Sequence, residues 1–325
     1  MSIVRRSSAA AAAALCLSTA AAAQAQPPDA CATRDGYLDA IMDAARSGRQ
    51  LEEMALMRTL TRAYGTRSSA SGATPDIAPA QARSDGTLAA AEPDPILAAL
   101  RSDPDWRKLA EPERQRALAR AYLQAGKPAQ AELELGEAIA NQPTYSLYWH
   151  DLAEVYAYQG RRDKAAAALV VVTDWTANAD ALRQSYAQAA QRDSGNGVPY
   201  AQALQLLAAR TAALAQREAA LAPKPLTKGA DGKFEAMPVM LFDTCIRPSY
   251  PRSSLRNEET GAVTLEFLVD TEGKPVQIRK VRSSGHAALD NETLLSLSAC
   301  SFKPLVAEGK PAAAWATVQY VWTMD

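Results

Sequence analysis

Histidine is almost absent from this chain of 325 residues, which contains only His150 and His286. The sequence also has no paired-histidine zinc motif, no glycine-rich phosphate loop and no nucleophile elbow. Ser283 and Ser284 lie near His286 and Asp290, but these residues coincide with an expected turn and helix cap rather than with a catalytic triad. The sequence therefore predicts a protein that is not an enzyme and that holds no metal or cofactor.

Neither positive nor negative charge is in excess, because the chain has 35 Lys and Arg residues and 36 Asp and Glu residues, which gives a net charge of -1. This balance gives no electrostatic reason to expect nucleic acid or an anionic membrane as a partner. After the first residues, no segment is long and apolar enough to cross a bilayer. We expect the partner to be a protein or peptide that is recognised by shape and local pattern.

The first 25 residues have the layout of a secretory signal peptide. Arg5 and Arg6 precede an uncharged run, and Ala23-Gln24-Ala25 forms a small-residue cleavage site. The alternative is an uncleaved membrane anchor, because residues 7–28 carry no charge and are long enough to span a bilayer. Most of these residues are alanine, which is barely hydrophobic, so we favour cleavage after Ala25 and export of the mature chain.

Cysteine is scarce, and three of the four cysteines follow the predicted cleavage site. Export to an oxidising compartment favours a disulfide between Cys245 and Cys300, which flank the C-terminal module. Cys31 would then remain unpaired. The alternative is that these cysteines are buried free thiols.

Two helices are predicted between Asp35 and Tyr64, because large apolar residues recur there at helical spacing and the pattern breaks at Ser47-Gly48. We treat residues 26–64 as an N-terminal helical hairpin. Residues 65–95 are rich in Ser, Ala, Gly, Pro and Asp and contain almost no large side chains. Such a composition predicts a flexible linker.

An internal repeat occupies the middle of the chain. Residues 118–138 match residues 152–172 at a constant interval, which for Ala119 and Ala153 is 153 − 119 = 34 residues. The small residues let paired helices approach, the tyrosine fills the gap and the glycine permits the turn. The matched positions are Ala119 and Ala153, Tyr122 and Tyr156, Gly126 and Gly160, and Ala131 and Ala165.

This pattern resembles the tetratricopeptide repeat family, which implies antiparallel helix pairs stacked into an array over residues 96–222. We expect a degenerate third unit at Asp180–Arg192 and a capping helix at Pro199–Leu221. The resemblance implies that the concave face holds a peptide or a protein. The alternative is an array that only serves as a spacer. Residues 223–238 form a short linker rich in Pro, Gly and Lys.

The C-terminal module, residues 239–325, predicts two strands, a helix and a final strand. Ala262–Val269 alternates as a half-buried strand, and the turn at Asp270–Pro275 places Gly273 where a positive φ is needed. The return strand, Val276–Val281, changes phase near Lys280, which indicates a bulge. Asp290 or Asn291 is expected to cap a helix that runs to about Cys300.

The final stretch, Trp315–Met324, predicts a long strand rich in aromatic residues. One face carries Ala316, Val318, Tyr320, Trp322 and Met324, and the other carries Trp315, Thr317, Gln319 and Val321. Between Lys310 and Asp325 the sequence has no charge, and after Pro311 it has no proline. Such an edge lacks the usual protection against pairing with another chain.

The module resembles the C-terminal domain of TonB, the energy transducer of Gram-negative envelopes. The residues that carry the resemblance are Pro248-Ser249-Tyr250-Pro251, Gly261-Ala262-Val263, Val269-Asp270, Gly273, Pro275, Val281, Ser283-Ser284-Gly285, Leu289-Asp290, Phe302-Lys303-Pro304 and Gly309-Lys310-Pro311. The resemblance implies a periplasmic ββαβ domain whose last strand pairs with the TonB box of an outer-membrane receptor. The implied partner-binding residues are Ala316, Val318, Gln319, Tyr320, Val321 and Trp322, with Tyr250 and Pro251 nearby.

The family's transducers differ from this chain in two respects. They keep an N-terminal membrane helix that meets the proton-driven ExbB and ExbD proteins, and they cross the periplasm with a long proline-rich span. Here the N-terminus has a cleavable layout and helical repeats stand in the middle of the chain.

The sequence as a whole predicts an α+β multidomain protein of the periplasm, or one anchored in the inner membrane and facing the periplasm. We expect it to bind an extended peptide by strand addition, with a possible role in energy-coupled transport across the envelope. The alternative function is an adaptor for envelope assembly, in which the repeats hold the partner and the terminal sheet only anchors or dimerises the protein. Homodimerisation through the last strand is a further possibility.

Overall fold

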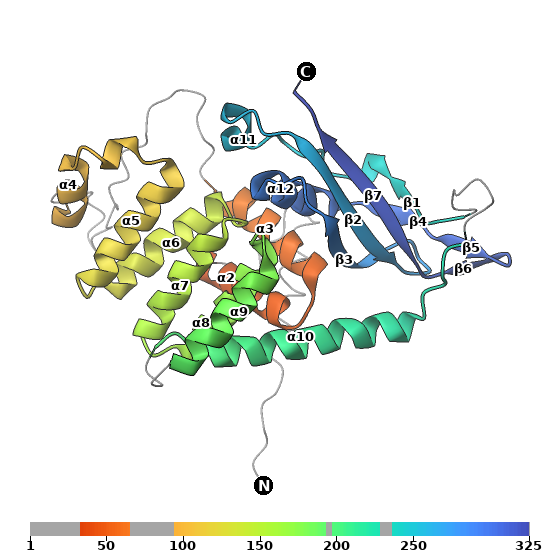
Figure 1. Cartoon of the computed structure of the whole chain (residues 1–325), viewed down its shortest axis with the longest axis horizontal. Helices are drawn as coiled ribbons and strands as arrows, with labels where there is room; N and C mark the ends of the chain where they lie inside the picture. The colour runs from red at the N-terminus through yellow and green to blue at the C-terminus, as the bar shows by residue number, and fades with distance from the viewer. Residues whose placement is uncertain (1–32, 66–93, 193–196, 228–235, 325) are drawn as a thin grey trace, which may run out of the picture.

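The computed structural model describes residues 33–65, 94–192, 197–227 and 236–324 (Figure 1). The predicted signal peptide, Cys31 and most of the predicted linker at residues 65–95 lie outside these ranges. The helices are α2 (Arg34–Arg46), α3 (Gln50–Tyr64), α4 (Pro95–Ser102), η2 (Trp106–Lys108), α5 (Glu111–Gln124), α6 (Pro128–Asn141), α7 (Ser146–Tyr158), α8 (Arg162–Trp175), α9 (Ala179–Arg192), α10 (Tyr200–Leu221), η3 (Phe242–Thr244), α11 (Arg252–Arg256) and α12 (Ala287–Leu297).

The strands all belong to the C-terminal part of the described chain. They are β1 (Val239–Leu241), β2 (Gly261–Val269), β3 (Pro275–Arg282), β4 (Ser301–Lys303), β5 (Leu305–Ala307), β6 (Lys310–Ala312) and β7 (Ala314–Trp322). The α+β organisation predicted from the sequence is therefore confirmed. No helix within the described ranges combines the length and the apolar character that a bilayer span requires.

The helix pairs α5–α6 and α7–α8 have equivalent turns. Gly126 and Gly160 adopt positive φ values of 69° and 75°, a conformation that favours glycine. The residue after each glycine donates its N–H to the carbonyl of the repeat tyrosine, from Lys127 to Tyr122 at 2.9 Å and from Arg161 to Tyr156 at 2.8 Å. The same local chemistry thus builds the same turn twice, as the sequence repeat predicts.

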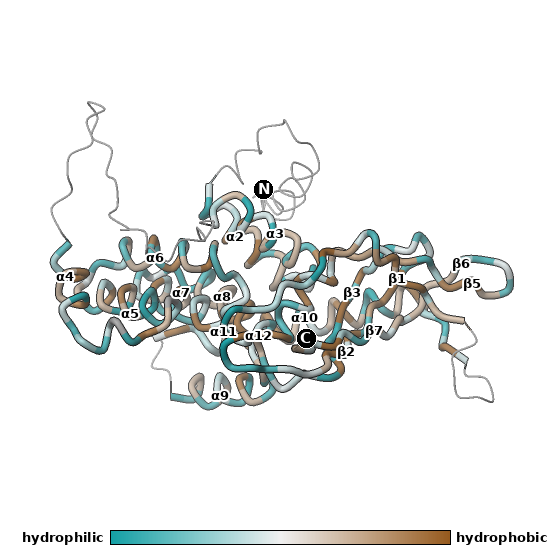
Figure 2. Tube along the Cα trace, turned by 90° about the horizontal axis from the view of Figure 1, so that it is seen from above, coloured by the Kyte–Doolittle hydropathy of each residue, from teal (hydrophilic) through white to brown (hydrophobic). Residues whose placement is uncertain are grey.

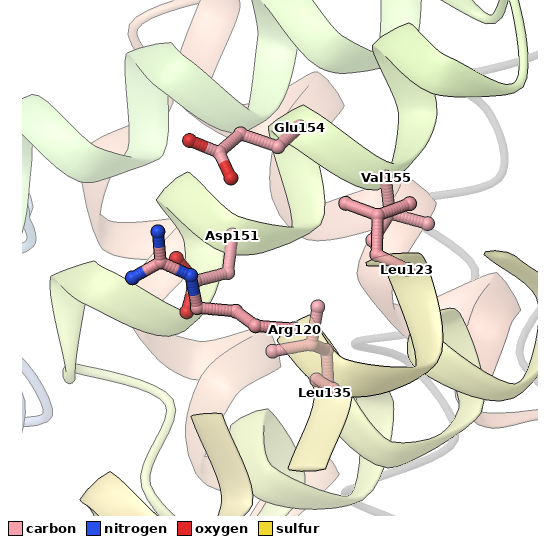
Figure 3. Close-up of a pocket in the computed structure, with 7 residues that line it drawn as sticks. Arg120, Leu123, Leu135, Asp151, Glu154 and Val155 are labelled. Carbon is pink, nitrogen blue, oxygen red and sulfur yellow. The ribbon is translucent and has the colours of Figure 1, made fainter. Parts of the chain in front are cut away.

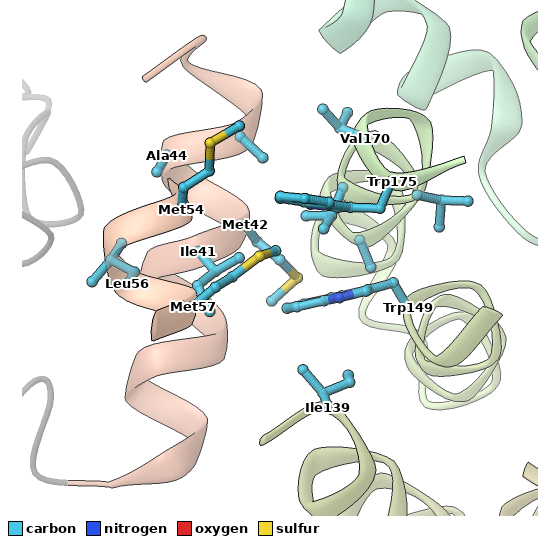
Figure 4. Close-up of a cluster of buried hydrophobic side chains, with 14 of the residues drawn as sticks. Ile41, Met42, Ala44, Met54, Leu56, Met57, Ile139, Trp149, Val170 and Trp175 are labelled. Carbon is cyan, nitrogen blue, oxygen red and sulfur yellow. The ribbon is translucent and has the colours of Figure 1, made fainter. Parts of the chain in front are cut away.

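The N-terminal hairpin α2–α3 packs on the second helix of each pair, with α2 against α8 and α3 against α6. Figure 4 shows Ile41 and Met57 of the hairpin on the side that faces Trp149 of the repeats. These apolar side chains are fully buried. Hairpin and repeats therefore share one hydrophobic core, although the pattern of the hairpin gave no sign of which helices it would meet.

Helices α9 and α10 continue the array. Tyr186 of α9 is buried and its ring lies 5.1 Å from the ring of Tyr200, the first residue of α10. The first half of α10 packs on α8, and the second half runs on toward the β-domain (Figure 1). A single long helix thus links the array to the terminal module.

The main sheet has the order β3-β2-β7, and both pairings are antiparallel. The predicted hairpin turn is present, with Gly273 at a φ of 83°. The predicted bulge is present as well, because Thr264 pairs with Arg282 and Leu265 with Lys280, which leaves Val281 as the extra residue. The sequence left open which strand β7 would join, and the structure places it beside β2.

Helix α12 begins earlier than the sequence predicted. It starts at Ala287 and ends at Leu297, so neither Asp290 nor Asn291 is the cap. His286 is the N-cap residue and makes no side-chain cap bond. The carboxylate of Asp290 instead accepts bonds from Ser284 and Lys280, which keeps it inside the first turn.

Two short antiparallel pairs, β1–β4 and β5–β6, were not predicted. Each strand has three residues, which is too few for alternation to be recognised in a sequence. The β5–β6 hairpin projects at the end of the molecule opposite α4 (Figure 2). The prediction of a module with only three strands was therefore incomplete.

The predicted disulfide between Cys245 and Cys300 is present. It joins the end of η3 to the residue just before β4, across a separation of 55 residues. In the chain-entropy model, closing a loop of this length stabilises the fold by about 4 kcal/mol. The bridge fixes the segment that leads to Tyr250 against the end of α12.

Candidate functional site

Strand β7 forms one edge of the main sheet along its whole length. It pairs with β2 from Ala314, opposite Val269, to Trp322, opposite Gly261, without a break in register. Among the described residues, no strand pairs with its other side. The predicted open edge is therefore a feature of the fold.

A hydrogen bond at the opposite edge of the sheet shows which residues of β7 turn their backbone N–H and C=O groups outward. The N–H of Ile278 in β3 donates to Gln50 Oε1 at 3.4 Å, so this residue faces away from β2. Successive residues in a strand turn their N–H and C=O groups to opposite edges. Phe267, which pairs with Ile278, therefore turns its backbone toward β7, where it meets Ala316.

By the same alternation, the outer side of β7 carries the backbone groups of Thr317, Gln319 and Val321. The N–H of Lys224 supports this assignment, because it donates at 2.8 Å to the carbonyl of Ala313, just ahead of the strand. Within the described chain, that bond is the only backbone contact on this side of β7 and its approach. Beyond it, an incoming strand would find four outward-facing residues, Trp315, Thr317, Gln319 and Val321.

The opposite edge of the sheet is closed in a different way. Helix α3 packs along β3, and Gln50 occupies the outward N–H of Ile278. A helix from a distant part of the sequence therefore covers the middle of β3, whereas no strand or helix pairs with the outer backbone of β7 within the described chain.

The two faces of β7 differ in exposure, as the sequence predicted. Ala316 and Trp322 are buried, while Val318 and Tyr320 are half-buried. Thr317, Gln319 and Val321 are exposed on the other face, and Val321 is 55% exposed. Of the predicted binding residues, Ala316 and Trp322 face the core, whereas Val318 and Tyr320 offer apolar surface beside the open edge.

An aromatic cluster supports the end of β7. The rings of Tyr250 and Trp322 lie 4.9 Å apart, and those of Tyr320 and Trp322 lie 5.0 Å apart. The indole of Trp322 donates to the hydroxyl of Thr293 in α12 at 3.0 Å. The structure thus brings Tyr250 to the predicted strand, and Pro251 follows it as the N-cap residue of α11.

The other face of β7 is tied to the helical array at Trp315. Its indole Nε1 donates to Glu218 Oε1 of α10 at 2.9 Å, and the guanidinium of Arg279 lies 4.0 Å from the centre of its ring. Arg279 also bonds to Glu266 of β2 at 2.6 Å. Glu218, Gln50 and Lys224 could not be predicted from the sequence, because nothing in their local patterns signals a contact with the sheet.

A catalytic triad is not formed by the residues around His286. The Ser284 hydroxyl bonds to Asp290 Oδ1 at 2.8 Å and to the backbone of His286, not to its imidazole. The imidazole Nδ1 instead lies 3.7 Å from Glu259. Burial opposes the ionisation of Asp290, but hydrogen bonds from Ser283, Ser284 and Lys280 outweigh it and lower its pKa. This network is a structural anchor for the start of α12.

A shallow surface depression lies between α5 and α7 of the repeats (Figure 3). Arg120, Glu154 and Asp151 line it, with apolar side chains below. Asp151 already pairs with Arg116, at 2.7 and 3.2 Å. No cluster of metal-binding side chains occurs within the described ranges.

Comparison with known proteins identifies the terminal module. Residues 246–324 match the family model described as Gram-negative bacterial TonB protein C-terminal. No curated protein and no solved structure matches the chain. The match confirms the resemblance for the module that carries β7 and supports a general role in the Gram-negative envelope. It does not extend to the helices of residues 34–221.

Proposed function

We propose that this protein binds an extended peptide of an envelope partner by strand addition at the outer edge of β7. The main support for this proposal is the row of outward backbone groups at Thr317, Gln319 and Val321, which have no partner within the described chain. An added strand forms ladder hydrogen bonds with these groups. The backbone contacts supply affinity for any extended segment of suitable length.

Selectivity arises from the side chains beside the edge. Peptide residues on the side of Val318 and Tyr320 would cover half-buried apolar surface, so apolar residues are favoured there. Residues on the other side would lie beside exposed Thr317 and Gln319 and can be polar. The partner segment therefore alternates apolar and polar residues.

The finer proposal is that this segment belongs to an outer-membrane receptor and that the protein acts in the periplasm, with a role in energy-coupled transport. The match of residues 246–324 to the TonB C-terminal family supports the kind of partner. The layout of residues 1–25 supports export.

Paired proline variants of the full chain test the docking site. Gln319→Pro removes an outward N–H and should keep the ladder to β2, since proline is tolerated on edge strands. Val318→Pro removes an N–H that faces β2 and should weaken the sheet itself. We expect Gln319→Pro to lower the affinity for peptides from receptor plug domains by at least about tenfold, or 1.4 kcal/mol.

The measurement is fluorescence anisotropy with labelled peptides, and urea unfolding shows that Gln319→Pro is folded. Unchanged binding by a folded Gln319→Pro variant would reject strand addition on this edge. Thr317→Pro provides an independent repeat of the test, because its N–H also faces outward. Val321→Thr retains the outward N–H and serves as the control that should bind like the natural chain.

The adaptor function remains the second candidate. The depression between α5 and α7 favours it, because this face of the repeats is not covered by the α2–α3 hairpin. Capture of an envelope protein that survives Gln319→Pro but is lost in Arg120→Glu would support the adaptor. Homodimerisation through β7 predicts a sedimentation coefficient that rises with concentration and that Gln319→Pro lowers.

A further inference from the structure

A buried acidic cluster lies where three helices of the array meet. Glu53 of α3 is 1% exposed, and Trp175 at the end of α8 donates its indole N–H to Glu53 Oε1 at 3.0 Å. The neighbouring Asp174 forms a short ion pair with Arg210 of α10, which is 5% exposed. The carboxyl group of Asp174 is close enough to that of Glu53 for a hydrogen bond between them.

The charge of this cluster does not balance when both carboxyl groups are ionised. Two carboxylates then share one guanidinium, and a hydrogen bond between carboxyl groups needs a proton on one of them. Burial raises the pKa of Glu53 well above its ordinary value, and the charge of Asp174 raises it further, against the opposing effects of Arg210 and Trp175. One proton on the pair leaves the cluster neutral.

No other cation among the described residues is bound to Glu53. Five cationic side chains on these and neighbouring elements have partners of their own. These are Arg49 with Asp43 and Glu52, Arg58 with the backbone of α12, Arg217 with Gly48, Arg34 with Glu137, and Lys280 with Asp290. Two carboxyl groups elsewhere in the described chain also have pKa values raised mainly by burial: Glu134, at about 7, and Glu292.

Each of the three helices that form the cluster also holds the terminal module. Arg58 of α3 donates to the carbonyl of Leu295 in α12 at 2.6 Å. The carbonyl of Trp175 at the end of α8 accepts from the Asn291 amide of α12 at 3.1 Å. Further along α10 from Arg210, Glu218 binds Trp315 of β7. Separation of these helices would therefore release the module as well.

We propose that Glu53, Asp174 and Arg210 form a proton-operated latch that controls whether the terminal module stays docked on the helical array. With one proton shared by the carboxyl pair, α3, α8 and α10 pack around a neutral cluster. Loss of that proton leaves an uncompensated negative charge in the core, and the helices then separate so that water can reach it. This regulation does not depend on which peptide, if any, binds at β7.

The variant Glu53→Gln tests the latch, because glutamine can keep both hydrogen bonds but cannot ionise. The measurement is hydrogen exchange of the α12 backbone amides, residues 287–297, in the full chain, corrected for the intrinsic effect of pH. Between about pH 6 and about pH 9, we expect opening in the natural chain to rise by at least about tenfold, the equivalent of one pKa unit. In Glu53→Gln the rise should disappear.

Two variants keep the result decisive. Asp174→Asn removes the neighbouring charge. The charge of ionised Glu53 should then be compensated by Arg210, so the pH-dependent rise in opening should be lost. Glu134→Gln is the matched control, because Glu134 has a raised pKa but bonds to neither Asp174 nor Trp175, and it should retain the rise. Equal pH dependence in the natural chain and in Glu53→Gln, or its loss in Glu134→Gln alone, would overturn the latch.

Discussion

The indole nitrogen of Trp315 and the carboxylate of Glu218 are 2.9 Å apart and join the strand with the open edge to the longest described helix. Trp315 is the second residue of β7, and Glu218 lies in the last turn of α10. The helical array thus reaches β7 directly. Together with Lys224, which binds the carbonyl of Ala313, this contact fixes where the open edge begins.

The bond between Trp315 and Glu218 is expected to stabilise the junction by about 1 kcal/mol, the usual contribution of a partly buried hydrogen bond. A double-mutant cycle with Trp315→Phe and Glu218→Ala should give a coupling energy of this size in urea unfolding. Leu214→Ala, one turn earlier on α10, is the control and should show no coupling to Trp315→Phe. A coupling energy near zero for the first pair would mean that the bond does not hold the junction.

Removal of the disulfide should destabilise the terminal module. The double variant Cys245→Ser/Cys300→Ser is expected to lose about 4 kcal/mol, because the unfolded chain regains the freedom of the 55-residue loop. The measurement is urea unfolding followed by tryptophan fluorescence, since Trp315 and Trp322 both lie in β7. Reduction of the natural chain should produce a similar loss, and an equal midpoint with and without reductant would contradict this prediction.

The stabilisation that the ion pair between Lys280 and Asp290 gives to the start of α12 should depend on pH. Because hydrogen bonds lower the pKa of Asp290 in the folded state, its contribution is complete above its ordinary pKa and is lost as the pH falls through the lowered value. Asp290→Asn is therefore expected to lose about 2 kcal/mol at neutral pH, where Lys280 and Ser284 lose a charged partner. The difference from the natural chain should shrink in acid.

The matched control is Asp105→Asn, which breaks the ion pair with Lys108 at 2.7 Å on the surface. Both of its side chains are at least 75% exposed, so the loss should be a few tenths of a kcal/mol at most. Urea unfolding over a range of pH values measures both variants. Similar losses in the two variants would show that burial does not strengthen the Asp290 pair.

Two glycines with positive φ should respond differently to alanine. A Cβ at Gly273 would lie 2.0 Å from the carbonyl oxygen of Phe302, whereas a Cβ at Gly285 meets nothing within 4 Å. Gly285→Ala should lose only about 1 kcal/mol from backbone strain. Gly273→Ala should lose more than about 3 kcal/mol, because the turn must also move away from β4. Thermal unfolding gives both values, and equal losses would rule out the close approach.

Local pattern was sufficient for much of the terminal module. Alternating side chains predicted β2 and β7, the phase change near Lys280 predicted the bulge, and Gly273 predicted the turn. The predicted start of α12 was wrong because Asp290 has the residue type of a cap but bonds to Ser284 and Lys280 instead. A side chain that can cap a helix can also satisfy a loop, and the sequence does not distinguish the two.

By itself, the sequence determined the repeat, the terminal family and the existence of an uncharged last strand, because each depends on residue types at fixed local intervals. The disulfide was favoured by the predicted export, but the structure decided it against the alternative of free thiols. The sequence also predicted that the last strand would be an open edge, but only the tertiary structure decided that β7 joins β2 and that a helix packs on β3. Helix α3 closes β3 through Gln50, and α10 meets β7 only at its beginning through Glu218. These contacts join residues more than 90 positions apart in the chain. Such contacts depend on how whole helices pack against the sheet, and no local pattern in the sequence indicates that packing.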